Sequence, residues 1–165
     1  MPEKKTMRAA REDEREGKAP TTQAGEFVRE EMHHVREGKH GARSPKQAIA
    51  IGLSKARRAG VRLRPPKEGT TSKRTVRNAQ RNLAAGAHPH STSRARSQAV
   101  TGALKREGRG SASKGALARQ ARSAASKRGA SARSAAARKA VTTKGAAGRS
   151  GAAKKAARTR AKHRG

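Results

Sequence analysis

The stretch "SPKQAIAIGLSKARRAGV", residues 44–61, carries a complete set of signals for one α-helix. Ser44 is suited to cap the amino end, Pro45 fits the first helical position, and Gln47 completes a capping box. Gly60 offers the left-handed backbone conformation that closes many helices. These signals predict a helix that starts at Pro45 and ends just before Gly60.

A second apolar stripe lies upstream, in residues 24–37. Val28, Met32 and Val35 recur at the spacing of one helical face, and Gly38 is placed to end the helix. The linker "GKHGAR" between the two helices is six residues long, which favours an antiparallel helical hairpin. The residues expected to pack between the two helices are Phe27, Val28, Met32, Val35, Ile49 and Leu53.

The hairpin is small for an independent fold. From Gly25 to Val61 it has 37 residues, and the chain has no cysteine. Domains below about 40 residues usually need disulfides, metals or self-association. We therefore expect the hairpin to dock on a second copy, on the downstream helices or on a partner protein.

Residues 1–17 are predicted to form a short charged helix with little to bury. Its apolar side consists of Met7, Ala9 and Ala10, and Gly17 and Pro20 are expected to break the chain after it. We predict a frayed, solvated helix here.

Charge is distributed unevenly along the chain. Residues 1–37 hold nine of the eleven acidic residues and eight basic ones, whereas residues 38–165 hold 34 bases and two acids, Glu68 and Glu107. The whole chain carries a formal charge of +31. Such a charge repels itself and attracts polyanions, so nucleic acid is the expected partner and a membrane surface the second candidate.

The carboxyl-terminal part is low in complexity. Residues 109–165 hold 19 Ala, 17 Lys or Arg and no acid, and the whole chain is only 32% apolar, with Phe27 as its one aromatic residue. Alanine favours helix, but like charges four residues apart oppose it. We predict a mostly α fold with extensive disorder: a short antiparallel helical hairpin followed by a Lys/Arg/Ala-rich tail that is disordered until it meets phosphates.

Four segments follow from these patterns. They are a charged amino-terminal segment (1–21), the hairpin module (22–61), a basic linker with short helices (62–108) and a disordered basic tail (109–165).

The basic residues are expected to neutralise nucleic-acid phosphates without reading sequence. Single-strand and RNA modules stack bases on aromatic side chains, which this chain lacks, so duplex DNA is favoured. The expected contacts are Arg57, Arg58, Arg62, Arg119, Arg122, Lys127, Arg128, Arg133, Arg138 and Lys139. RNA or ribosome association is the closest alternative, and an adaptor whose hairpin binds a protein is another.

Other functions find little support in the sequence. His33, His34, His40, His88 and His90 are expected to be solvated, without a metal ion or another cofactor. No pattern of a catalytic nucleophile or phosphate loop is present, so no enzyme is predicted. The start lacks a secretory signal, and the longest apolar run is too short to span a membrane.

The hairpin sequence resembles a known family. Residues 26–61 are similar to an uncharacterised family of small basic bacterial proteins that share an acidic amphipathic stretch, a Gly-Lys-rich loop and the motif "KQAIAIGLSxARxAG", here Lys46 to Gly60. The resemblance implies a bacterial, cytoplasmic protein and no known activity. The tail is similar in composition to linker-histone tails, so the expected role is that of a nucleoid-associated, histone-like DNA-binding protein.

Overall fold

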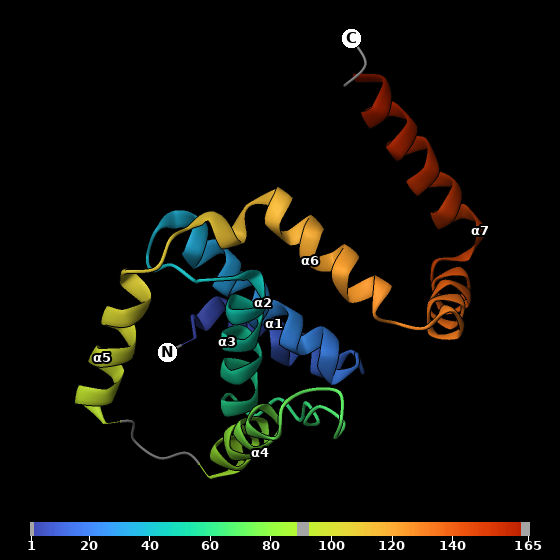
Figure 1. Ribbon diagram of the computed structural model, residues 1–165. Coiled ribbons are helices and arrows are strands. Elements are labelled where there is room, and N and C mark those ends of the chain that lie inside the picture. Colours follow the sequence, from blue (N-terminus) through green and yellow to red (C-terminus); the bar gives the residue numbers. More distant parts are fainter. Residues whose placement is uncertain (1, 89–92, 163–165) are drawn as a thin grey trace. The chain divides into compact units, whose positions relative to one another are not determined.

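The computed structural model describes residues 2–88 and 93–162 and is predominantly helical (Figure 1). The elements are α1 (Lys4–Arg15), α2 (Pro20–Glu37), α3 (Pro45–Arg58), α4 (Lys73–Ala87), α5 (Arg94–Lys105), the 3-10 turn η1 (Gly110–Ala112), α6 (Lys114–Ser126) and α7 (Ala130–Lys162). Backbone contacts divide the chain into two units, residues 1–120 and 121–165. The division falls inside α6, away from the segment boundaries expected at 61 and 108.

The expectation of extensive disorder was wrong, because the chain is 76% helical. The helical class itself was correct. Between Lys127 and Arg149 no two basic residues are three or four positions apart, so the repulsion that weakens helices is largely avoided there. Alanine, the best helix former, then determines the local structure.

Helix α3 has the boundaries that its capping residues predict. The Ser44 hydroxyl accepts from Gln47 N at 3.3 Å, and the Gln47 side chain accepts from Arg43 N at 2.8 Å. At the other end Gly60 has φ 98°, and Val61 N donates to Ala56 O at 3.1 Å. Side chain and backbone thus satisfy groups at both ends of the helix.

Helix α2 starts earlier than its apolar stripe suggested. It begins at Pro20, at the first helical position, and ends at Gly38 with φ 78°. Proline was expected to break the chain here, but its fixed φ and missing N–H suit the first turn of a helix.

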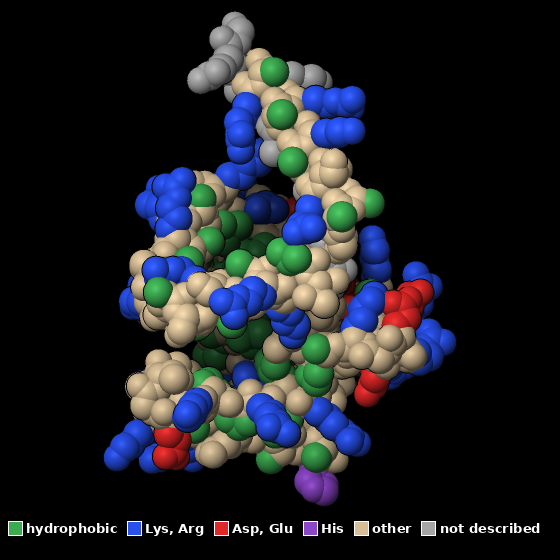
Figure 2. Space-filling view, turned by 90° about the vertical axis from the view of Figure 1, so that its right-hand side faces the viewer, with side chains coloured by type: hydrophobic (Ala, Val, Ile, Leu, Met, Phe, Trp, Pro, Cys, Tyr) green, Lys and Arg blue, Asp and Glu red, His purple; other side chains and the backbone are tan. Residues whose placement is uncertain are grey.

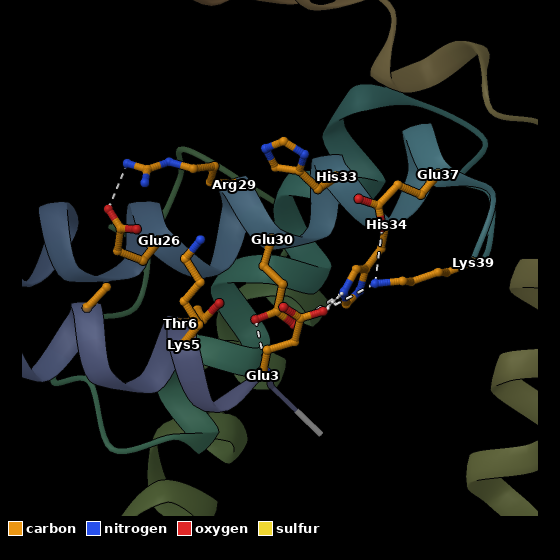
Figure 3. Close-up of a pocket in the computed structure, with 11 residues that line it drawn as sticks. Glu3, Lys5, Thr6, Glu26, Arg29, Glu30, His33, His34, Glu37 and Lys39 are labelled. Atoms are coloured by element: carbon orange, nitrogen blue, oxygen red, sulfur yellow. Dashed lines mark hydrogen bonds and ion pairs between the residues drawn. The ribbon is translucent and has the colours of Figure 1, made fainter.

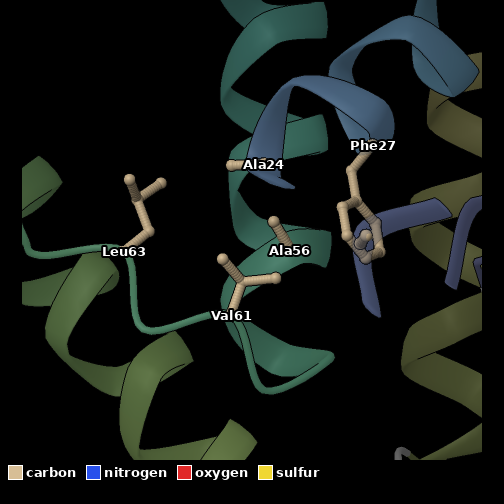
Figure 4. Packing of buried hydrophobic residues seen from close by; sticks show 6 residues of the cluster. Ala24, Phe27, Ala56, Val61 and Leu63 are labelled. Carbon is tan, nitrogen blue, oxygen red and sulfur yellow. The ribbon is translucent and has the colours of Figure 1, made fainter. Parts of the chain in front are cut away.

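Helices α2 and α3 form an antiparallel pair, as two clusters of buried side chains demonstrate. In cluster 1, Ala24 and Phe27 from the first half of α2 meet Ala56 near the end of α3 (Figure 4). In cluster 2, Met32 and Val35 from the second half of α2 meet Ala48 near the start of α3. Of the remaining predicted packing residues, Leu53 lies against cluster 1, and Val28 and Ile49 lie against cluster 2.

Small residues let the two helices approach closely. Ala48, Gly52 and Ala56 recur every four residues along α3 and all are buried. A Cβ added to Gly52 would lie 2.7 Å from the Cα of Val28 on α2. The glycine in "AIAIGL" therefore serves a close backbone approach.

Helix α1 is packed against α2, contrary to the expected solvated helix. Thr6, Ala10 and Asp13 are buried, and Met7 joins cluster 1. Its 12 residues, about three turns with one small apolar stripe, are enough because they pack against the apolar surface of α2 around Phe27.

Further segments of the same unit complete the core. Val61 and Leu63, after α3, belong to cluster 1, while Ala112 of η1 and Leu117 of α6 contact cluster 2. Helix α4 packs on α3, and its Val76 is buried. The hairpin, too small alone, thus finds its docking partners within residues 1–120.

Candidate functional site

Most acidic side chains of residues 1–58, the part with α1 to α3 that is called the head below, form ion pairs within it. Ten ion pairs among the described residues join side chains between Glu3 and Lys55, a stretch that includes α1, α2 and most of α3. Lys55 Nζ, for example, lies 2.6 Å from Glu31 Oε2. The helices after α3 differ from the head, because the sequence there holds only two acids, Glu68 and Glu107, that could pair with their basic side chains.

Most of the predicted phosphate contacts are on the surface. Figure 2 shows Lys and Arg side chains spread widely over the face in view, with acidic side chains in few places. The predicted residues that are exposed are Arg58, Arg62, Arg119, Arg122, Lys127, Arg128, Arg133, Arg138 and Lys139.

Arg57 was wrongly placed among the phosphate contacts, because it is only 6% exposed. Its Nε donates to Leu63 O at 3.1 Å and its Nη2 donates to Arg64 O at 3.3 Å. Burial lowers the pKa of its guanidinium from the ordinary value. Arg57 therefore holds the segment after α3 against the helix, while its neighbour Arg58 faces solvent.

Helix α4 carries a basic stripe that the sequence reading missed. Arg74, Arg77 and Arg81 are exposed and follow the three- and four-residue spacing of one helical face. The opposite face carries the buried Val76 and Ala79. The sequence does contain a signal for this basic stripe. Val76 and Ala79 mark the apolar face of an amphipathic helix, so the arginines lie on its outer face.

The second unit has no buried face among its described side chains. Those of residues 127–142 are all exposed. Helix α7 bends at Gly145, whose φ of 62° and ψ of 179° interrupt the helix. Arg133 and Arg138 of α7 are five residues apart, which places their charges at different positions around the helix axis.

Two of the three hairpin histidines, His34 and His40, are not solvated as predicted. The His34 and His40 side chains are only 12% and 13% exposed. His40 Nε2 lies 3.1 Å from Oε1 of Glu31, which is fully buried. His33 and His88 are exposed, and His90 lies outside the described residues. A tertiary contact between helix and loop forms this cluster, so sequence spacing alone could not reveal it.

Helix α1 contributes to the same region through Glu3 (Figure 3). Its Oε1 lies 2.9 Å from His34 Nε2 and 3.2 Å from Lys39 Nζ, and its backbone N donates to Glu30 Oε2 at 3.2 Å. The hydrogen bond with His34, and then that with Lys39, lowers the pKa of the Glu3 carboxyl. His34 and Glu3 also line a polar groove of about 330 Å³ between α1 and α2.

Comparison with known proteins adds the following. Residues 20–68 match a family described as "Family of unknown function (DUF6496)". The match covers α2, α3 and the segment that includes Val61 and Leu63, so it coincides with much of the core. No curated protein and no solved structure matches the chain.

One structural finding bears on membranes. Within the described ranges, every helix is either too short or too polar to span a lipid bilayer.

Proposed function

We propose that the protein is a non-enzymatic, sequence-independent duplex DNA-binding protein of the nucleoid-associated, histone-like kind. The observation that supports it is the separation of charge: most acids of the head are in internal ion pairs, while α4 and the later helices present bases to solvent. Such a surface matches a duplex, which carries one charge per ~1.7 Å of its axis.

Duplex is favoured over single strands by the position of the one aromatic residue. Phe27 is fully buried in cluster 1 and offers no face on which a base can stack. Proteins that bind single strands rely on such stacking, worth about 1–3 kcal/mol per base. Phosphate contacts by Lys and Arg, which need no aromatic residue, are what this surface supplies.

The test compares two triple variants of the full chain that lose the same charge. In the first, Arg74, Arg77 and Arg81 of α4 become Gln; in the second, Arg8, Arg11 and Arg15 of α1 do. Each triplet is exposed and has the same spacing on its helix, but the α1 triplet lies among the acidic residues of the head.

Affinity for a short duplex of random sequence is measured across a range of salt concentrations. The plot of log affinity against log salt for the wild type should be steep, and the α4 variant should flatten it by about 2–3, since each phosphate contact contributes roughly 0.9. The α1 variant should keep the wild-type slope. Equal slopes in all three proteins would contradict a DNA-binding site on α4. The same titration with an RNA duplex tests the alternative, because tighter binding of RNA than of DNA would make RNA the partner.

A further inference from the structure

We propose that Glu31, His34 and His40 form a binding site for one divalent metal ion, best suited to Zn²⁺. The site joins the second half of α2 to the loop before α3. It is independent of the proposed DNA-binding surface.

The ligand atoms of the three residues already converge. One nitrogen of each histidine and one oxygen of Glu31 lie within 4.8 Å of one another. Zinc holds such ligands at about 2.0–2.2 Å, which places them roughly 3.3 Å apart in a tetrahedral site. The Glu31–His40 contact of 3.1 Å already meets this requirement.

The orientation of the His40 ring leaves its Nε2 atom available to bind a metal ion. His40 Nδ1 lies 3.0 Å from Gly41 O, and because a carbonyl only accepts, Nδ1 carries the proton. The other ring nitrogen, Nε2, lies 3.1 Å from the buried Oε1 of Glu31. A buried carboxylate oxygen needs a positive partner, and a metal ion bound by the same ring nitrogen would supply one. A metal ion there would bind both.

The surroundings prepare the ligands for a metal. Lys55 Nζ contacts Glu31 Oε2 at 2.6 Å, which leaves Oε1 to act as a single-oxygen ligand. The Gly41 carbonyl orients the His40 ring, and Glu3 places a carboxylate 2.9 Å from His34 Nε2. Metal-binding histidines are typically held by a carbonyl or carboxylate in this way.

Charge and ligand type favour zinc. The carboxylates of Glu3, Glu30 and Glu31 outnumber the ammonium groups of Lys39 and Lys55 around the cluster. Two imidazoles with a carboxylate are a common zinc ligand set. The groove between α1 and α2, which His34 lines, gives the ion a route of access.

The ion would stabilise more than the hairpin. Gly41 N donates to Leu104 O at 2.8 Å, and Ala42 N donates to Gly108 O at 3.1 Å. The loop that contains His40 therefore holds the end of α5 and the chain after it. Fixing His40 to α2 through a metal would fix these contacts as well.

The test is a calorimetric titration of the full chain with zinc chloride, after treatment with a chelator. The wild type should bind one zinc ion at this site, and His40→Asn and His34→Asn should each weaken that binding at least about tenfold. The matched control is His33→Asn, which changes the exposed neighbour of His34 and should leave affinity unchanged.

A second measurement on the wild type does not depend on how well the variants fold. In ¹H–¹⁵N spectra of the imidazole groups, one equivalent of zinc should shift the His34 and His40 signals and leave those of His33 and His88 in place. Absence of zinc binding, or equal binding by the His33, His34 and His40 variants, would overturn the proposal. So would shifts confined to the other histidines.

Discussion

Two adjacent arginines at the end of α3 have opposite environments. Arg57 is buried and donates to Leu63 O and Arg64 O, whereas Arg58 is exposed and its Nε donates to Ser54 O at 3.3 Å within its own helix. Sequence alone could not distinguish them, because "ARRAG" offers the same charge twice. The difference arises from the chain that turns back after Gly60 and brings carbonyl groups to Arg57.

Replacing Arg57 with Met should lower the free energy of unfolding by about 1–3 kcal/mol, since the Leu63 and Arg64 carbonyl groups lose their donor. Arg58→Met removes the same charge at the surface and should change stability by less than about 0.5 kcal/mol. Urea unfolding followed by circular dichroism measures both. Equal stability of the two variants would mean that the guanidinium of Arg57 does not hold the chain after α3.

The contacts of Lys18 make the stability of the fold depend on pH in the alkaline range. Its Nζ lies 2.7 Å from Asp13 Oδ1 and 2.6 Å from Glu16 Oε2, and hydrogen bonds to Asp13 first, then Glu16, raise its pKa above the ordinary 10.5. The stabilisation is complete below pH 10.5 and is lost as the pH rises through the raised pKa.

Lys18→Met should therefore lose less stability than the wild type when the pH is raised above 10.5. The control Lys4→Met removes an exposed lysine at the other end of α1 and should behave like the wild type. Thermal unfolding on both sides of that pH compares the three proteins. A wild-type pH profile in the Lys18 variant would contradict the linkage.

At the scale of the element, capping residues and packing surfaces differ in how far sequence reveals them. The ends of α3 were predictable because Ser44 and Gly60 act on their own neighbours. The docking of α1 was not, since Met7 and Ala10 form too small a stripe to indicate what they contact. The cluster of Glu31, His34 and His40 likewise depends on how the loop folds over α2.

Gly52 offers a test of helix packing against helix propensity. Gly52→Ala should destabilise the fold by about 1–3 kcal/mol, because the new Cβ would lie 2.7 Å from Val28 Cα. Gly25→Ala, on α2, places its Cβ in open space and should stabilise by roughly 0.5–1 kcal/mol. Denaturant unfolding shows whether each variant is more or less stable than the wild type. Stabilisation by both would mean that α2 and α3 are not in close contact at Gly52.

At the scale of the whole chain, the boundary between core and tail lies later than composition indicated. The acid-free sequence starts at 109, yet Ala112 is fully buried and its carbonyl accepts from Arg36 Nε at 3.0 Å. Leu117 also packs against cluster 2. Composition could not show this, because one alanine and one leucine in a Lys/Arg/Ala-rich stretch do not reveal which of its residues are buried.

Two truncations separate the core from the tail. A chain that ends at Gln120 keeps Ala112 and Leu117 and should unfold at the wild-type temperature, whereas a chain that ends at Gly108 loses both and should unfold at a lower one. Thermal unfolding by circular dichroism compares them.

The chain that ends at Gln120 should also bind duplex more weakly and with less dependence on salt, because residues 121–165 contribute bases and no acid. Wild-type duplex binding by that chain would place the DNA site wholly within residues 1–120, on α4 and its neighbours.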